Sequence, residues 1–412
     1  MTPFELTAIL MTLVAGAGWI NARTLRMPHG VAMLGLGILV ALALFALRGA
    51  HAARSVTEGV FGAVSHIDFV TAVVGIMLPF LLFAGAMQVD LVELRRRWLS
   101  VGALATLGVV GAVVVVGFGT WAIARALGIA LPLSWALVFG ALISPTDPVA
   151  VLATVKHGKL SKTLQVVLEG EALFNDGVGI VAFTALVAVA TGSGNADPLH
   201  AVLTVVVEAL GGLALGVVAA LGTIRLMQAI DEFAVEVGMT IALAMLVYAA
   251  AQWLHLSGAI AVVGAGMMFG GERGKHAIAG QTEVHMKSFW SLVDEILNAL
   301  LFLLLGVEML IVPFAPAQLW LILSVVVLVV AARFAVVLPW GAYFRLRLAE
   351  RGATLILGWG GLHGALSLAL ALSLGAGPER TLILALTYAV VAFSITVQGL
   401  TFTPLTRWLQ RD

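Results

Sequence analysis

Apolar segments long enough to cross a lipid bilayer recur along nearly the whole of this 412-residue sequence. A helix needs about 20 apolar residues to span the hydrocarbon core, and helices satisfy their own backbone hydrogen bonds there. The sequence therefore predicts an all-α polytopic membrane protein. Polar residues, glycines and prolines divide it into thirteen predicted spans: 4–22, 30–47, 67–89, 100–124, 132–155, 164–191, 199–224, 237–254, 256–270, 288–310, 315–344, 352–375 and 381–406.

The composition agrees with this class and excludes several others. Hydrophobic residues are 61% of the chain and charged residues 11%, whereas a soluble domain carries roughly a quarter charged residues. Because the chain has no cysteine, disulfides, thiol nucleophiles and cysteine metal sites are excluded. A formal net charge of zero gives no indication of nucleic-acid binding. The first residues lack the basic region of a cleaved signal peptide, so we expect the first apolar segment to be retained.

Basic residues fall mainly on one side of this predicted topology. With the N-terminus outside and the loops alternating, the cytoplasmic loops contain 17 of the 22 Lys and Arg residues, and the opposite loops contain 4. Such a bias is the positive-inside signal of membrane proteins. We therefore expect a multi-pass protein of the plasma (inner) membrane, with its N-terminus outside and its C-terminus in the cytoplasm.

Two predicted spans contain residues that interrupt a helix. In span 132–155, Pro145 and Pro148 flank Asp147, and each proline removes a backbone donor and disfavours helix just before it. In span 352–375, four glycines occur within the seven residues 358–364. Interrupted helices in corresponding halves of a transporter indicate a binding site near the middle of the membrane.

The positions of the two breaks predict an internal repeat. They fall in the fifth and twelfth spans, and an odd offset between repeats inverts their topology. We therefore expect two inverted six-helix repeats, residues 1–191 and 237–406, joined by a linking helix within 192–236. The two discontinuous helices would cross, and helix 164–191 would carry the ion site.

Four polar residues in and beside the first break form the candidate site. Asp147 follows Thr146 where unwound backbone exposes carbonyl oxygens, and Asp176 follows Asn175 inside an apolar span. Ionisable groups at this depth are costly, by about 3 kcal/mol on insertion scales. Na⁺ prefers hard oxygen ligands, and these residues offer carboxylate, amide, hydroxyl and carbonyl oxygens. The alternatives are that Asp147 caps a half-helix and that neighbours satisfy a structural Asp176.

A buried carboxylate at Asp176 predicts competition between two ligands. Desolvation penalises the charged form of the group, so either a proton or a cation must neutralise it. If the empty, charged carrier cannot cross because of the same penalty, that competition is enough to couple cation movement to proton counter-movement. Asp176 is therefore the predicted cation and proton carrier, with Asp147 as a second ligand of the transported monovalent cation.

A second group of buried charges suggests a structural ion pair. Glu171 precedes Asn175 by four residues and shares its helix face. Arg333 lies in the middle of a span and must therefore meet a carboxylate or a cavity. We expect Glu171 to pair with Arg333 or with His363, which lies in the glycine-rich break. For His363 two interpretations stay open, a neutral histidine bonded to free carbonyls and a group that titrates near physiological pH.

Several motifs together resemble one family. The chain is similar to NhaP-type sodium/proton antiporters, of the cation:proton antiporter family that includes the sodium/hydrogen exchangers. The similarity runs from about residue 23 to residue 405. The segments that carry it are Ser144-Pro-Thr-Asp-Pro-Val-Ala-Val151, Gly170-Glu-Ala-Leu-Phe-Asn-Asp-Gly177, Phe289-Trp with Asp294-Glu and Asn298, Leu301-Phe-Leu-Leu-Leu-Gly306 and Trp359-Gly-Gly-Leu-His-Gly-Ala-Leu-Ser367.

This resemblance implies a fold and a mechanism. It implies thirteen helices, a homodimer in the lipid membrane, and elevator-like movement of a core domain against a dimerisation domain, with no cofactor besides the transported ions. The essential aspartate of the family corresponds to Asp176, and its Thr-Asp pair corresponds to Thr146 and Asp147. Members with Asn-Asp are generally electroneutral, so Asn175 implies exchange of one Na⁺ or Li⁺ for one H⁺.

Three positions depart from the family pattern. Ala172 replaces a common serine, His363 replaces an arginine that pairs with the motif glutamate, and Ala84 replaces a common glutamate. These changes remove a hydroxyl and an acid and turn a permanent charge into a titratable one. They leave potassium/proton exchange open as an alternative. A channel and an intramembrane aspartyl protease using Asp147 and Asp176 are remoter alternatives, since the Gly-x-Gly-Asp pattern of such proteases is absent.

Overall fold

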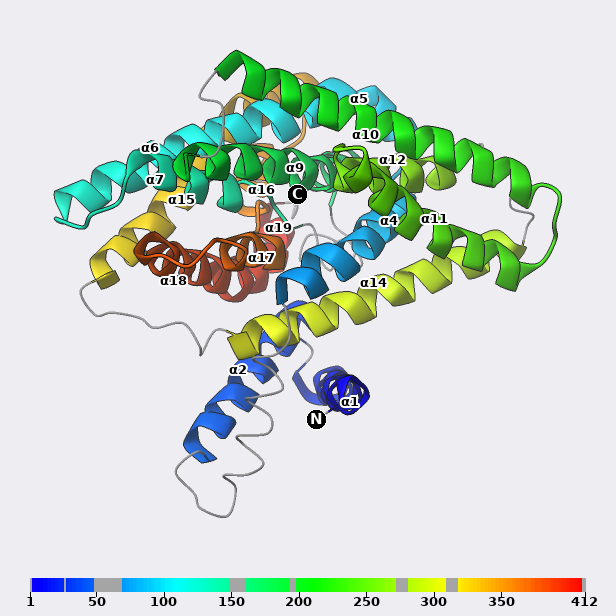
Figure 1. Ribbon diagram of the computed structural model, residues 1–412, viewed down its shortest axis with the longest axis horizontal. Helices are drawn as coiled ribbons and strands as arrows, with labels where there is room; N and C mark the ends of the chain where they lie inside the picture. The colour runs from blue at the N-terminus through cyan, green and yellow to red at the C-terminus, as the bar shows by residue number, and fades with distance from the viewer. Residues whose placement is uncertain are drawn as a thin grey trace.

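The computed structural model describes residues 2–25, 27–47, 69–147, 160–192, 198–271, 281–308 and 318–409. Within those ranges the chain is helical apart from turns, short connections and one isolated β-bridge. The α-helices are α1 (Pro3–Ile20), α2 (His29–Leu47), α4 (Leu78–Gln88), α5 (Leu91–Ala103), α6 (Val109–Ala126), α7 (Leu133–Ile143), α9 (Lys162–Ala190), α10 (Pro198–Met227), α11 (Phe233–Trp253), α12 (Gly258–Gly270), α14 (Gln281–Glu308), α15 (Leu319–Leu348), α16 (Ala353–Trp359), α17 (Ala365–Leu372), α18 (Pro378–Phe393) and α19 (Gly399–Leu409). Figure 1 shows α9 near the centre, with α1 and α2 at one end.

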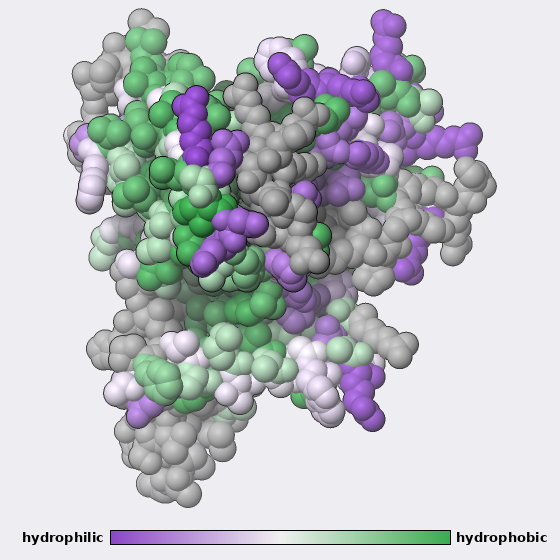
Figure 2. Space-filling model, turned by 90° about the vertical axis from the view of Figure 1, so that its right-hand side faces the viewer, coloured by the Kyte–Doolittle hydropathy of each residue, from purple (hydrophilic) through white to green (hydrophobic). Residues whose placement is uncertain are grey.

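The predicted all-α membrane class is confirmed. In the described part of the chain, nine helical segments are long and apolar enough to cross a membrane, and α2, α7 and α12 contribute shorter apolar helices. Together with α16 and α17, these helices overlap every predicted span. Large apolar side chains such as Val218 and Val327 are each 68% exposed, which fits contact with lipid. In Figure 2, hydrophobic residues dominate the left of the visible face, and hydrophilic residues gather toward its upper right.

The predicted start of one span is wrong. The span expected over 100–124 begins in the structure at Leu91, and a continuous helical segment runs to Ala126. Asp90 caps this start, since its carboxylate accepts hydrogen bonds from the backbone N–H groups of Val92 and Glu93. Three consecutive arginines, residues 95–97, interrupt the apolar stretch in the sequence. They fit within α5 because it is an amphipathic helix, in which charged residues occupy one face and apolar residues pack from the other.

Both predicted interruptions are present, and they meet. α7 ends at Ile143, and residues 145–147 are not helical. The other break separates α16 from α17. The backbone N–H of Asp147 donates to the carbonyl of Leu362 at 2.6 Å, which forms the isolated antiparallel bridge. One backbone hydrogen bond therefore joins the two unwound segments. The remainder of predicted span 132–155, residues 148–155, lies outside the described residues.

The predicted division near His255 is also correct. α11 ends at Trp253, His255 adopts a left-handed backbone conformation with φ of 53°, and α12 begins at Gly258. α12 then packs closely because it is rich in glycine. A Cβ at Gly266 would lie 2.7 Å from the backbone oxygen of Phe83 in α4. Small residues permit this backbone approach between membrane helices. α10 lies within the predicted linking segment 192–236, whereas its linking role and the two inverted repeats stay predictions.

Candidate ion-binding site

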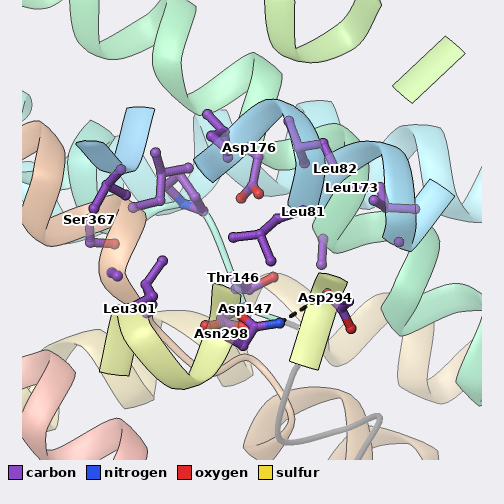
Figure 3. A pocket seen from close by; sticks show the side chains of 18 residues that line it. Leu81, Leu82, Thr146, Asp147, Leu173, Asp176, Asp294, Asn298, Leu301 and Ser367 are labelled. Carbon is purple, nitrogen blue, oxygen red and sulfur yellow. Dashed lines mark hydrogen bonds between the residues drawn. The ribbon is translucent and has the colours of Figure 1, made fainter. Parts of the chain in front are cut away.

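A cavity of about 90 Å³ lies where the two unwound segments meet α4, α9 and α14. A single water needs only about 10–15 Å³ of such space, so the cavity can hold several waters or a partly hydrated ion. Its wall is mostly apolar, with a few polar groups directed inward (Figure 3). The polar side chains that line it are Thr146, Asp147, Asp176, Asp294, Asn298 and Ser367.

Helix α9 brings Asp176 to this cavity. The hydroxyl of Ser161 caps the helix by accepting from the N–H of Leu164, and the helix then runs unbroken through the predicted site. Asp176 lines the cavity together with Ala172, one turn earlier. Its side chain is only partly buried, and Figure 3 shows the carboxylate directed into the cavity across from Thr146 and Asp147. Two carboxylates from different elements thus face the same small space.

Asn175 holds the unwound segment and faces away from this cavity. Its Nδ2 donates to the hydroxyl of Thr146 at 2.8 Å, and its Oδ1 accepts from the backbone N–H of Thr146 at 3.4 Å. The amide is 1% exposed and lines a separate, smaller cavity with Glu171. Of the four residues predicted as cation ligands, Thr146, Asp147 and Asp176 therefore line the main cavity. Asn175 fixes the position of one of them.

The predicted ion pair of Glu171 forms with Arg333, not with His363. The guanidinium of Arg333 contacts the carboxylate through both terminal nitrogens, with Nη2 at 2.9 Å from Oε2. Its Nε donates to the carbonyl of Leu357 in α16 at 3.2 Å. Such two-pronged, charge-assisted bonds are among the strongest in proteins. Arg333 therefore ties α9 and α15 to the helix that precedes the glycine-rich break.

His363 links the two interruptions. Its Nδ1 lies 3.2 Å from the carbonyl oxygen of Pro145, and its backbone N–H donates to the hydroxyl of Ser394 at 2.8 Å. That hydroxyl donates in turn to Gln398, within a π-helical turn over Ser394–Gln398. The imidazole is 6% exposed and borders the small cavity that Glu171 and Arg333 also line. This geometry matches the structural interpretation of His363 and leaves its titration untested.

Three polar lining residues, Asp294, Asn298 and Ser367, were not among the predicted site residues. Asp294 and Asn298 lie on α14, opposite α9, and Nδ2 of Asn298 donates to Oδ1 of Asp294 at 2.9 Å. Their spacing of four residues signals a shared helix face, but the sequence does not indicate that this face meets Asp176. Of the departures from the family pattern, Ala172 lines the cavity, whereas Ala84 is fully buried elsewhere.

A charged cavity between membrane helices, where two interrupted helices meet, is typical of secondary transporters. Comparisons with known proteins agree. The family model described as sodium/hydrogen exchanger, transmembrane, matches residues 9–408. The Na⁺/H⁺ antiporter NhaP of Pseudomonas aeruginosa is 38% identical over 98% of this chain and 96% of its own. The Na⁺/H⁺ antiporter NhaH of Halobacillus dabanensis is 32% identical over 94% of this chain and 93% of its own.

A solved structure supports the same fold. The sodium proton antiporter MjNhaP1 of Methanocaldococcus jannaschii superposes with a TM-score of 0.75 at 18% identity, covering all of both chains. This chain belongs to the transmembrane sodium/hydrogen exchanger family, and its relatives are transporters, not enzymes. It is accordingly a multi-pass membrane protein.

Proposed function

We propose that the protein exchanges Na⁺ or Li⁺ for H⁺ across the membrane, with the two ions competing for the carboxylate of Asp176. The observation that carries this proposal is the cavity in which Asp176 faces Asp147 and Thr146 across a space of a few waters. Carboxylate, hydroxyl and unwound backbone oxygens suit a hard monovalent cation. The family and the named activities of the relatives support the same assignment.

Competition at one carboxylate also gives the stoichiometry that we propose. A proton and a monovalent cation carry the same charge, so the loaded site has the same net charge in both states. Asn175 adds no second titrating carboxylate, because its amide is neutral and is held by Thr146. Exchange is therefore electroneutral, one cation for one proton. Alternating access proceeds by elevator-like movement within a homodimer, with the N-terminus outside and the C-terminus in the cytoplasm.

The test is dye-reported pH change in everted membrane vesicles, with Na⁺, Li⁺ and K⁺ added in turn. We expect dequenching with Na⁺ and Li⁺ and little response to K⁺. The rate should not change when the membrane potential is clamped to zero with valinomycin and K⁺. A response to K⁺ alone would establish potassium/proton exchange instead, and a rate that follows the potential would exclude electroneutral exchange.

The position of His363 leads us to expect that exchange depends on pH. Protonation would place a positive charge beside Arg333 and against the carbonyl of Pro145, within the segment that holds Thr146. We expect exchange by the parent protein to decline more steeply toward acid pH than exchange by His363→Arg, whose charge is constant. His363→Gln is the matched control, because its amide can still donate to Pro145 but does not titrate. Superimposable profiles of all three proteins would remove this role.

A further inference from the structure

A groove much larger than the ion cavity lies between α5 and α12, on the other side of α9 from the ion site. Its volume of about 910 Å³ is in the upper range of small-molecule pockets, which run from about 300 to 1,000 Å³. Phe174 lines this groove, whereas Leu173 and Asp176 line the ion cavity. At 3.6 residues per turn these positions point to opposite sides of the helix. The groove is therefore a separate site that shares one wall with the transport site.

One end of the groove carries positive charge. Arg95 and Arg96, on successive positions of α5, both line it and are exposed. The single acid in the lining, Asp90, is matched by Lys162 at 2.5 Å, and this hydrogen bond lowers the pKa of the Asp90 carboxyl. Glu93 pairs with Arg96 at 3.5 Å and with Arg97 at 3.1 Å.

Among the described residues of this cluster, Arg95 is the basic residue that forms no ion pair. The ion pairs found among the described residues engage both acids near it and leave Arg95 without an acidic partner. An exposed guanidinium beside a large groove offers two parallel donors to a planar or tetrahedral oxyanion, for which a phosphate is well suited.

The rest of the groove is apolar. Met267 and Met268 of α12 line it together with Phe174 and Val101, and methionine side chains adapt to irregular apolar ligands. Trp98, on the same face of α5, is 63% exposed, and tryptophan is enriched where membrane helices meet the lipid headgroups. A soluble phosphate would satisfy the arginines but leave these walls in contact with water. The combination fits a molecule with an anionic head and a hydrocarbon tail.

We propose that the groove between α5 and α12 binds an anionic phospholipid, with its phosphate on Arg95 and Arg96 and an acyl chain along Phe174 and Met267. We further propose that this lipid sets the rate of exchange, which rests on the function proposed above. Basic pockets between membrane helices bind anionic headgroups elsewhere, and each arginine contributes about a fivefold gain in attraction.

The coupling to transport runs through α9. A Cβ at Gly170 would lie 3.0 Å from Leu94 and from Val101 in α5, so α5 packs directly on the helix that carries the site. Phe174 immediately precedes Asn175, whose amide holds Thr146. A lipid in the groove contacts α12 on one side and α5 and α9 on the other. It therefore restrains movement of α9 relative to α12, and alternating access requires such movement.

Two measurements on the purified full-length protein test the proposal. Native mass spectrometry reports phosphatidylglycerol that the protein retains, independently of transport. Exchange is then followed in vesicles of phosphatidylcholine alone and with increasing fractions of phosphatidylglycerol. The double variant Arg95→Gln, Arg96→Gln should bind phosphatidylglycerol roughly 30-fold more weakly and lose the response to it. Arg345→Gln, Arg347→Gln is the matched control, since it removes two exposed arginines from the last turn of α15.

A second variant fills the groove and keeps both arginines. Gly102 lines the groove, and a Cβ added there meets no atom within 4 Å. Gly102→Leu should therefore fold, because leucine favours helix over glycine, and should exclude the acyl chain. Gly222→Leu on α10 is its control, since that exposed position also has no atom within 4 Å.

The outcomes separate this proposal from the transport assignment. Retention of phosphatidylglycerol that both groove variants lose and both controls keep supports the lipid site. Equal retention in all proteins, or none in the parent, overturns it, even if exchange is normal. Loss with the arginine variant but not with Gly102→Leu indicates surface attraction alone and also overturns the groove. Bound lipid without exchange in any vesicle would instead contradict the transport function.

Discussion

Asp176→Asn is expected to abolish cation/proton exchange while leaving the protein folded. The amide has nearly the same shape as the carboxylate, so packing around α9 is preserved. It can neither release a proton nor neutralise a cation in a cavity whose lining is mostly apolar. Vesicles containing the variant should show the same pH trace after addition of Na⁺ or Li⁺ as vesicles without the protein.

The matched control for this variant is Asp294→Asn. It makes the same acid-to-amide change in the same cavity, but on α14 and beside Asn298. We expect it to retain exchange with a higher half-saturating cation concentration, because one negative charge near the site is lost. Exchange by Asp176→Asn at the parent rate would show that Asp176 is not the carrier. Equal losses in both variants would assign transport to the total charge of the cavity.

The parts of this fold that follow from local chemistry could be predicted from the sequence. Pro145 has no N–H to donate, and four glycines over residues 358–364 disfavour helix, so both interruptions are visible as residues. Apolar length predicted spans, each of which a described helix overlaps. The start of α5 was predicted too late because hydropathy is averaged over a window, and the arginines lower that average. Such an average also does not detect a helix cap such as Asp90, which precedes the arginines.

Only the site residues that lie in the two sequence motifs, such as Asp147 and Asp176, were predicted. Asp147 and Asp176 stand out because a charge inside an apolar span has no local explanation. The direction of Asn175 depends on its hydrogen bonds with Thr146 in the proline-containing break. That contact depends on how the unwound segment lies against α9, which the sequence does not show. Asp294 joins the cavity because of how α14 packs against α4 and α17. Its charge near a span end looks the same in sequence as a solvated helix terminus.

The ion pair between Glu171 and Arg333 predicts the largest effect on stability. Glu171→Ala would leave the guanidinium in a site where its side chain is 10% exposed, which costs roughly 3–5 kcal/mol when a buried pair loses one member. We expect a lower yield of folded protein and a lower melting temperature in detergent by fluorescence. The ion pair also orients the guanidinium for its hydrogen bond to the carbonyl of Leu357, so the variant should weaken this link between α15 and α16.

A compensating double variant separates the pair's structural role from a role in transport. In Glu171→Leu, Arg333→Met both charges are replaced by apolar groups of similar size, a change that is often neutral or stabilising for buried pairs. We expect it to recover most of the melting temperature lost in Glu171→Ala and to regain exchange. Recovered stability without exchange would mean that the charges themselves take part in transport. An unchanged yield and melting temperature of Glu171→Ala would contradict the structural role directly.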